Sequence, residues 1–466
     1  MKKTENKVFA VLALITALVI VYCSYLVGSY AGVGAGVGAL VVGGVILAVI
    51  ALLAKKHCKG MIVLVVLYLI VLVIGGALGY KVDQNVGKTE TKGEVETVYV
   101  AALKDSGISA EDDFSNYRIG YLNGEVDAYK RCSEILKEHD KRVERTVPYK
   151  STKTLHRKLN DGRVDLLLLT GRVADELEEI DEKYMDKLVI LFQKTYQLGK
   201  VEAKHVNIEK EPFVLYLQGA DSSGRKDINS TGRGDANILV AVNPTTKKIN
   251  MQVVPRDTFV NIPSMGGHSK LSYSGWWGGV QSSIESIEET FDVDINYYAK
   301  INWNGVVGLV DALGGVDVYS QYDFYDSDTH YVQGYNHLNG EEALGFVRER
   351  KSLPENELSR GKNQMAMIKA ILNKFAMNPN FDDAMTAMNA ITDSFVTNVP
   401  KKDYLKAFNL GLKMMPEIEK LEMKSMDGEF NWKHDEVNGE YKYYFYPAEG
   451  EKERVKADIE KIKSGK

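Results

Sequence analysis

Cysteine is scarce in this chain of 466 residues, and its three copies lie far apart. Cys23 lies in an apolar run and Cys58 in a short loop, so Cys132 is alone in the large polar region. That region therefore folds without an internal disulfide. The cysteine spacings also exclude a zinc knuckle, and the sequence has no His-Glu-x-x-His helix of the kind that binds catalytic zinc.

A surplus of basic residues is missing as well. The chain has 58 lysines and arginines against 63 acidic residues, which gives a formal net charge of -5. Because binding to a nucleic-acid backbone depends on a clustered excess of lysine and arginine, we expect no nucleic-acid partner. Any binding site for an anion must therefore depend on a local group of basic residues.

Charges are rare in the first eighty residues, where three runs contain none: Val8–Val27, Val33–Ala54 and Met61–Tyr80. A helix rises about 1.5 Å per residue, so about twenty apolar residues cross a hydrocarbon core of about 30 Å. A cleaved signal peptide would explain the first run alone, but a second run follows it directly. The sequence therefore predicts three transmembrane helices within residues 1–80.

The lysines that flank these runs indicate the orientation of the helices. The loop Ser29–Gly32 has no basic residue, whereas lysines precede the first run and separate the second from the third: Lys2, Lys3, Lys7, Lys55, Lys56 and Lys59. Basic flanks stay in the cytoplasm. We therefore expect a multi-pass protein of the cell membrane with a cytoplasmic N-terminus, and everything after Tyr80 outside the cell.

The external region is predicted to contain two folded units. Residues 81–96 are polar and aperiodic, which is typical of a linker. In residues 97–205, strand-like runs alternate with helical stretches, which predicts a small α/β accessory domain. The strand-like runs are Tyr117–Leu122, Val164–Thr170 and Leu188–Gln193, and Val126–Lys137 is helical. A main domain follows at residues 206–400, and we assign no activity to the C-terminal extension at residues 401–466.

A hairpin in the main domain is predicted to gather charged residues. The runs Ala236–Val242 and Ile249–Val254 favour strands and are joined by turn-forming residues. In a hairpin, the residue before the first strand lies beside the residue after the second. If a strand from Phe213 pairs antiparallel with the first hairpin strand, one sheet edge collects five charged residues: Asp221, Arg233, Asp235, Arg256 and Asp257.

Two later helices carry further polar candidates. Asn339 and Glu342 have the spacing of a capping box, which predicts a helix that ends near Arg348 and Arg350. In the next amphipathic helix, Arg360 and Gln364 are four residues apart and share one face.

Arginines grouped with aspartates point to a phosphorylated ligand. The planar guanidinium group donates two hydrogen bonds to phosphate oxygens and is always protonated. Asp221 and Asp235 would repel such a ligand unless a divalent cation lay between them, and Mg²⁺ uses one or two carboxylates together with substrate phosphates. Solvated loop residues or surface ion pairs are the alternative interpretation, and spacing alone does not decide between the two.

An ordered set of motifs runs from Gly219 to Gln364. The motifs are, in order, Gly219 with Asp221, Gly232-Arg233-Gly234-Asp235, Val254-Pro255-Arg256-Asp257, Lys270-Leu271, Asp311 with Gly314-Gly315-Val316, Leu338-Asn339-Gly340 with Ala343-Leu344, Val347-Arg348-Glu349-Arg350, and Arg360 through Gln364. In this order they resemble the motifs of the LytR-CpsA-Psr family. The chain departs from the family pattern at Glu357, where an aspartate is usual. The three-span front and the accessory domain resemble the capsule-type branch of the family.

The resemblance implies an α/β/α catalytic domain with a central mixed sheet, an apolar pocket for a polyprenyl chain and a charged mouth for its pyrophosphate. Asp221 and Asp235 match the carboxylates that hold Mg²⁺ or Mn²⁺, and together with Arg233 and Arg256 they match the catalytic residues. The residues that match pyrophosphate contacts are Arg233, Arg256, Arg348, Arg350 and Gln364. Three further residues are expected to contact these site residues and hold them in position: Asp257, Lys270 and Arg360.

The expected activity is transfer of a glycan, such as a capsular polysaccharide or teichoic acid, from an undecaprenyl-pyrophosphate carrier to a peptidoglycan hydroxyl in a Gram-positive bacterium. Asp221 or Asp235 would accept the proton of that hydroxyl, and the sequence does not choose between them. Hydrolysis of the same lipid and a non-catalytic role in regulating capsule assembly are the alternatives.

Overall fold

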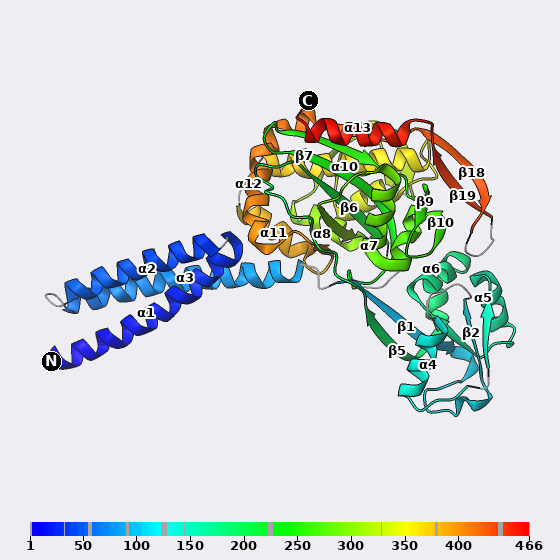
Figure 1. Ribbon diagram of the computed structural model, residues 1–466, viewed down its shortest axis with the longest axis horizontal. Coiled ribbons are helices and arrows are strands. Elements are labelled where there is room, and N and C mark those ends of the chain that lie inside the picture. The colour runs from blue at the N-terminus through cyan, green and yellow to red at the C-terminus, as the bar shows by residue number, and fades with distance from the viewer. Residues whose placement is uncertain are drawn as a thin grey trace.

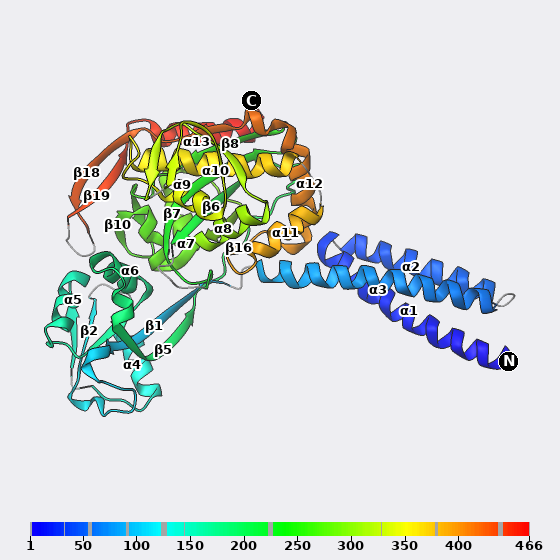
Figure 2. The ribbon, with the colours of Figure 1, turned by 180° about the vertical axis from the view of Figure 1, so that it is seen from behind.

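The computed structural model describes residues 2–31, 33–54, 58–89, 93–122, 128–143, 145–221, 227–327, 329–377, 381–436 and 441–465. Three parts follow one another along the chain: a bundle of long N-terminal helices, the accessory domain and the main domain (Figure 1). Seen from behind, the bundle and the accessory domain again project from different sides of the main domain (Figure 2). The predicted combination of apolar N-terminal helices with α/β domains is confirmed.

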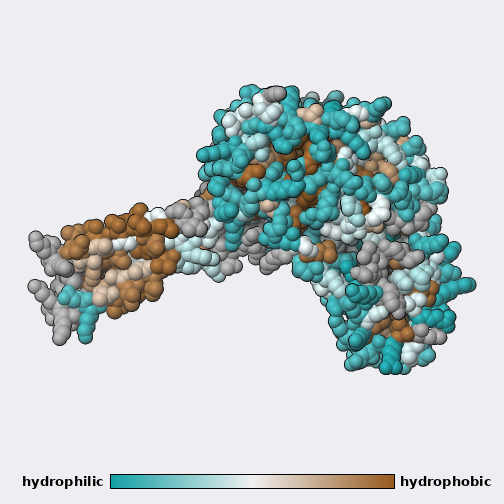
Figure 3. All heavy atoms as spheres, viewed as in Figure 1, coloured by the Kyte–Doolittle hydropathy of each residue, from teal (hydrophilic) through white to brown (hydrophobic). Residues whose placement is uncertain are grey.

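The helices of the N-terminal bundle contact one another. They are α1 (Lys2–Ala31), α2 (Val33–Ala54) and α3 (Cys58–Thr89). Asn6–Ser29 and Ala35–Ala54 are long and apolar enough to cross a membrane, and α3 holds a shorter apolar stretch, Met61–Gly76. Apolar side chains cover much of the bundle surface in Figure 3, as expected for helices surrounded by lipid. Helix α3 continues to Thr89, into the segment predicted as a linker.

The accessory domain is a five-stranded sheet in the order β3-β2-β4-β1-β5, between helices. Its elements are β1 (Val95–Leu103), β2 (Arg118–Leu122), α4 (Ala128–Glu138), β3 (Arg145–Tyr149), α5 (Thr152–Asn160), β4 (Leu166–Leu169), α6 (Gly171–Ile180) and β5 (Leu188–Gln197). Helix α4 packs on one face with Leu166 and Leu168, and α5 and α6 pack on the other with Leu167 and Leu169. Because both faces are covered, β4 is apolar throughout. The strands and the helix predicted here are confirmed.

The main domain is built on a six-stranded sheet in the order β16-β11-β6-β7-β8-β17. Its strands are β6 (Phe213–Asp221), β7 (Arg233–Asn243), β8 (Lys248–Val253), β11 (Tyr297–Asn302), β16 (Phe395–Thr397) and β17 (Glu422–Lys424). The pairs β6–β11 and β8–β17 are parallel, and the other neighbours are antiparallel. The predicted hairpin, its antiparallel partner strand and the mixed sheet are confirmed.

Helices cover both faces of this sheet. They are α7 (Leu271–Phe291), α10 (Glu357–Met377), α12 (Tyr404–Met414) and α13 (Glu451–Lys463). Because successive side chains of a strand point to opposite faces, Val214 and Tyr216 of β6 pack with α7 and α13. Phe213 and Leu215 lie in the opposite cluster with α10 and α12. The α/β/α arrangement expected from the resemblance is therefore present.

A further apolar cluster lies beside α10 and holds the predicted capped helix. Its elements are α8 (Trp303–Ala312), β12 (Val316–Ser320), β13 (Phe324–Asp326), β14 (Thr329–Tyr331), β15 (Gly334–Leu338) and α9 (Gly340–Arg348), with α11 (Phe381–Ile391) against α8. Asn339 and Glu342 form a capping box at the start of α9, and Arg348 is its last residue. Both features were predicted from the sequence.

Residues 401–466 complete the main domain instead of standing apart from it. Strand β17 forms an edge of the central sheet, and α13 packs on the sheet through Val455 and Ile459. Strands β18 (Gly428–His434) and β19 (Tyr441–Pro447) form a hairpin. It lies beside a small sheet of two strands, β9 (Phe259–Ile262) and β10 (Gly267–Lys270).

Candidate active site

The end of the β6–β7 pair brings the first two predicted residues together. In the antiparallel register Asp221 lies opposite Arg233, after a bulge between Gly219 and Ala220. Nη2 of Arg233 donates to Oδ2 of Asp221 at 2.9 Å. The charged sheet edge that the hairpin predicted therefore exists.

Asp235 and Arg256 join this pair. Nη1 of Arg256 lies 2.7 Å from Oδ2 of Asp235, and Nε of Arg233 lies 3.9 Å from Oδ1 of the same carboxylate. Arg256 follows β8, whose last strand residue pairs with Ile238, so the hairpin itself places Arg256 near Asp235. Two carboxylates thus flank the single guanidinium group of Arg233.

Three residues surround this centre as predicted. Nζ of Lys270 donates to Asp257 at 2.8 Å, and Asp257 lies 3.8 Å from Nε of Arg256. From α10, Nη2 of Arg360 contacts the backbone oxygen of Asp235 at 3.5 Å. Glu357, which replaces the usual aspartate, forms an ion pair with Arg360 at 2.7 Å. We name the set Asp221, Arg233, Asp235, Arg256, Asp257, Lys270 and Arg360 the charged cluster.

The charge state of the buried carboxylate follows from its neighbours. Burial by itself would raise the pKa of Asp235. The guanidinium groups of Arg256 and Arg233 outweigh burial and hold the pKa of Asp235 below its ordinary value. Asp235 is therefore ionised at neutral pH and presents a full negative charge inside the charged cluster.

Several buried atoms of the charged cluster have unused hydrogen-bonding capacity. Among the described residues, the buried atoms that make no hydrogen bond include Nε of Arg233, Arg256 and Arg360, and Oδ1 of Asp235. Each such atom costs about 1–3 kcal/mol when it is left without a partner. An anion with several oxygens can accept from the Nε groups, and a cation can bind the carboxylate oxygen. The cluster is therefore suited to an anionic ligand that comes with a cation.

Arg348, Arg350 and Gln364 are the remaining residues of the predicted site. Within the parts of the chain that the structure describes, no hydrogen bond or ion pair joins either arginine to Asp221 or Asp235. The guanidinium carbon of Arg348 lies 5.5 Å from the ring centroid of Trp303. Gln364 donates to the backbone oxygen next to Arg348, at 3.4 Å. Helix α10 thus links the end of α9 to the charged cluster, and the role of Arg348, Arg350 and Gln364 stays a prediction.

The accessory domain supplies a residue that the sequence gave no reason to choose. Glu179, in α6, forms an ion pair with Nη1 of Arg233. The same helix accepts a hydrogen bond at Asp175 from Nε1 of Trp276, at 2.6 Å, and places Arg172 5.0 Å from the ring centroid of Trp277. Glu179 and Arg233 are 54 residues apart and belong to different domains, so no local pattern could reveal the contact.

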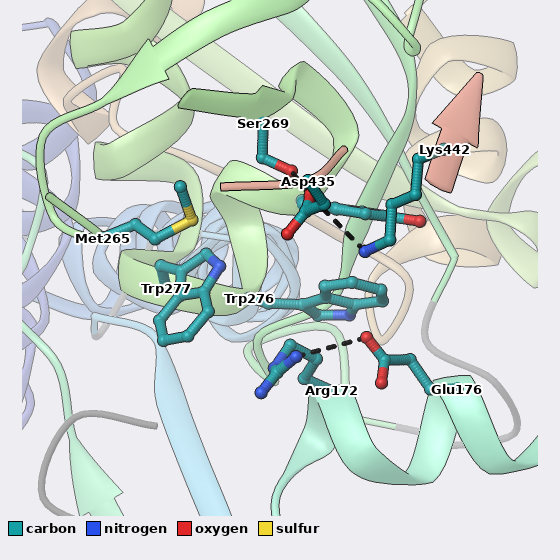
Figure 4. Close-up of a pocket in the computed structure, with 9 residues that line it drawn as sticks. Arg172, Glu176, Met265, Ser269, Trp276, Trp277, Asp435 and Lys442 are labelled. Carbon is teal, nitrogen blue, oxygen red and sulfur yellow. Dashed lines mark hydrogen bonds and ion pairs between the residues drawn. The ribbon is translucent and has the colours of Figure 1, made fainter. Parts of the chain in front are cut away.

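Beside this contact, a pocket opens between the two domains and the β18–β19 hairpin. Its wall consists of Arg172, Glu176, Met265, Ser269, Tyr273, Trp276, Trp277, Asp435 and Lys442. Figure 4 shows Arg172 and Glu176 on α6 facing the two tryptophans, with Lys442 and Asp435 approaching from the other side. Trp276 and Trp277 are thus part of the contact between the domains.

The fold and the site define an α/β protein with an apolar helical N-terminus and an arginine–aspartate cluster at one end of its main sheet. Residues 184–461 match the model of the LytR_cpsA_psr family, which is well over half of the 466 residues. The chain therefore belongs to the LytR_cpsA_psr family, as its motifs predicted. Together with the apolar helices, this membership identifies a membrane-anchored protein.

Several known proteins are similar to this chain over about half of its length. The chain is similar to the polyisoprenyl-teichoic acid–peptidoglycan teichoic acid transferase TagU of Bacillus mycoides, at 28% identity over 262 residues, 55% of this chain and 84% of the relative. TagU of Bacillus cereus is 32% identical over 220 residues, 46% of this chain and 71% of the relative. The solved structure of a Streptococcus agalactiae protein matches with a TM-score of 0.51 and 25% identity, over 57% of this chain and 92% of the other.

Proposed function

We propose that this protein is an enzyme that links a glycan to peptidoglycan by phosphoryl transfer outside the cell membrane. The donor is a glycan on undecaprenyl pyrophosphate, and the acceptor is a hydroxyl group of peptidoglycan. The TagU relatives are named as transferases of polyisoprenyl-linked teichoic acid to peptidoglycan. The observation that carries the proposal is the set of buried guanidinium donors without hydrogen-bond partners beside two aspartates.

The charged cluster suits each part of this reaction. The acceptor oxygen attacks the phosphorus that bears the glycan, and the bond from that phosphorus to the bridging oxygen breaks. Lipid monophosphate leaves, and the acceptor proton passes to Asp221 or Asp235. Charge builds up on the phosphate oxygens during this step, and Arg233 and Arg256, which form ion pairs with Asp221 and Asp235, would stabilise it.

A divalent cation, Mg²⁺ or Mn²⁺, is part of the proposal. Around Arg233, four cationic side chains (Arg233, Arg256, Lys270 and Arg360) meet five acidic ones (Asp221, Asp235, Asp257, Glu179 and Glu357), so the acidic groups outnumber the cationic ones by one. These carboxylates would repel a diphosphate. The carboxylates of Asp221 and Asp235 would hold the cation, which would neutralise the phosphate oxygens. No group of three or more His, Cys, Asp or Glu side chains among the described residues suits a metal, so the remaining ligands would be phosphate oxygens and water.

Removal of divalent cations is expected to abolish transfer, and added Mg²⁺ is expected to restore it. The full chain in detergent is treated with EDTA and incubated with a polyprenyl-pyrophosphate glycan and peptidoglycan, and the linked product is measured. Binding of Mn²⁺ is followed separately by electron paramagnetic resonance. Asp235→Asn is expected to weaken Mn²⁺ binding, whereas Asp165→Asn in the accessory domain serves as the matched control. Undiminished transfer in EDTA would contradict the cation.

The products of the same incubation test the proposed function itself. Glycan linked to peptidoglycan, together with lipid monophosphate, is the expected outcome. Free glycan phosphate would instead identify a hydrolase. A chain that binds the lipid and releases neither product would rule out the enzyme and favour a regulator of capsule assembly.

Glu179→Gln is expected to lower the KM for the lipid donor by about threefold. The carboxylate competes with a phosphate oxygen for Nη1 of Arg233. The Glu179 side chain is 49% exposed, so solvent screening limits this ion pair to about 1 kcal/mol. The measurement is the initial rate against donor concentration. Glu182→Gln removes a nearby exposed charge without touching Arg233 and is expected to leave KM unchanged. A higher KM in Glu179→Gln would make Glu179 a binding residue instead of a competitor.

The membrane anchor gives the proposed enzyme access to a lipid substrate. We propose that α1, α2 and α3 all cross the membrane, with the N-terminus in the cytoplasm and both domains outside. Figure 3 shows apolar side chains in the middle of the otherwise hydrophilic face of the main domain, and such a patch suits a polyprenyl chain. Tethering the main domain beside the bilayer raises the effective concentration of its substrate.

A further inference from the structure

The β18–β19 hairpin carries a row of aromatic rings on one face. Residues that lie directly opposite each other in an antiparallel pair share a face. From base to tip, the opposite pairs are Phe430 with Phe445, Trp432 with Tyr443, and His434 with Tyr441. We name these six side chains the aromatic ladder. The ring centroid of Tyr443 lies 5.2 Å from that of Phe430 and 5.3 Å from that of Trp432, so these three rings form a continuous row.

The aromatic ladder leaves the core and continues into solvent. Phe445 is fully buried in the main core, whereas Trp432 is 59% exposed, Tyr441 60% and Tyr443 42%. The core therefore explains the base of the ladder but not its outer rings. Contiguous exposed aromatic rings are costly in water and mark surfaces that bind a partner.

The other face of the hairpin connects the aromatic ladder to the charged cluster. Nζ of Lys442 lies 4.6 Å from the ring centroid of Tyr273, and Nζ of Lys270 lies 5.9 Å from the same ring. Lys270 in turn donates to Asp257 of the charged cluster. The backbone N–H of Phe445, at the base of the ladder, also donates to the backbone oxygen of Asp257 at 2.8 Å, so a molecule held along the ladder would reach the edge of the charged cluster at the ladder's base.

The position of the hairpin excludes the membrane as its partner. In both ribbon views β18 and β19 lie on the side of the main domain that faces away from α1, α2 and α3 (Figures 1 and 2). A second copy of the chain is also a poor partner. Three rings at about half exposure present roughly 300 Å², since a whole aromatic side chain buries about 150–250 Å², whereas a stable interface needs about 800 Å² on each side.

We infer that the aromatic ladder binds the glycan strand of the acceptor peptidoglycan. The C–H faces of sugar rings stack on flat aromatic rings, and a linear polysaccharide presents such faces in a row. The hairpin faces away from the membrane, toward the cell wall, and continues to the charged cluster. The role in catalysis rests on the proposed function, because binding at the ladder would bring an acceptor hydroxyl to the phosphate.

Binding of the full chain in detergent to purified peptidoglycan sacculi, stripped of attached polymers, tests this inference. The double variant Trp432→Ala/Tyr443→Ala is expected to bind about tenfold more weakly in a sedimentation assay, since each ring contact contributes a few-fold in affinity. Soluble β-1,4-linked N-acetylglucosamine oligomers are expected to change the tryptophan fluorescence of the parent and to change that of the variant much less.

The matched control is Tyr319→Ala/Tyr335→Ala, which removes another exposed cross-strand aromatic pair, 5.4 Å apart on β12 and β15. It is expected to bind sacculi like the parent. Equal binding by the ladder variant and the parent would overturn the inference, as would a ladder variant that only changes the oligomeric state. This binding assay contains no lipid donor, so its outcome does not depend on transfer. A chain that binds sacculi here but forms no product in the separate transfer assay would defeat the proposed function and leave this inference standing.

Discussion

Arg256→Met is expected to slow glycan transfer by about a hundred- to a thousandfold, the loss typical of removing one donor that stabilises a charged transition state. Nη1 of Arg256 lies 2.7 Å from Asp235, while its Nε has no hydrogen-bond partner. Nε is therefore the donor available to a phosphate oxygen. The variant also leaves the negative charge of Asp235 less compensated, which opposes a diphosphate. The measurement is the initial rate of lipid monophosphate release by the full chain in detergent.

Two further variants test whether the loss of activity is specific to the guanidinium group of Arg256. Arg256→Lys is expected to retain intermediate activity, because lysine keeps the charge but lacks the planar fork. Arg118→Met is the control, since Arg118 donates two hydrogen bonds of 2.9 Å to Asp165 inside the accessory domain. It is expected to transfer glycan like the parent. If Arg256→Met, shown to be folded by circular dichroism, transferred glycan as fast as Arg118→Met, Arg256 could not be a head-group contact.

The centre of the charged cluster could be predicted because strand geometry dictates it. Turn residues between two β-rich runs identify the β7–β8 hairpin, and a hairpin places the residues before its first strand beside those after its second. Arg233 and Arg256 therefore had to meet near Asp235, and the structure shows this. The antiparallel pairing of β6 then added Asp221.

Residues contributed by other elements could not be derived in this way. Arg348 lies at the end of α9, and its distance from the charged cluster depends on how α9 packs against α10, which no local pattern encodes. Glu179 belongs to a different domain, and its approach to Arg233 depends on the contact between the two domains. Family motifs named Arg348 but gave no indication of Glu179, because Glu179 lies outside the motifs.

Composition also gave an incomplete view of the connection between the membrane anchor and the domains. Residues 81–96 are polar, and a polar segment without periodicity indicates a linker. The structure instead continues α3 to Thr89 and begins β1 at Val95. Once a helix has formed, each added residue gains a hydrogen bond without a new nucleation cost, so a helix can extend beyond its apolar part. Helix α3 therefore includes residues that the composition had assigned to the linker.

Lys300→Met is expected to lower the free energy of unfolding by about 3–5 kcal/mol, the cost of leaving one partner of a buried ion pair alone. Lys300 and Glu94 are 2% and 4% exposed, and Nζ of Lys300 donates to Oε1 of Glu94. It also donates to the backbone oxygen of Ser230 at 2.9 Å, while Oε2 of Glu94 accepts from the backbone of Val280. At about 2–4 °C per kcal/mol, the thermal transition of the full chain in detergent should fall by roughly 10 °C.

This pair matters because Glu94 lies between α3 and β1, where the membrane anchor, the accessory domain and the main domain meet. Two variants distinguish the loss of stability caused by breaking a buried ion pair from the loss caused by removing any lysine. Lys204→Met breaks exposed ion pairs, since the Lys204 side chain is 48% exposed, and should cost less than about 1 kcal/mol. Glu94→Gln/Lys300→Met removes both charges and should recover most of the stability. Equal losses in Lys300→Met and Lys204→Met would show that the buried pair does not hold the domains together.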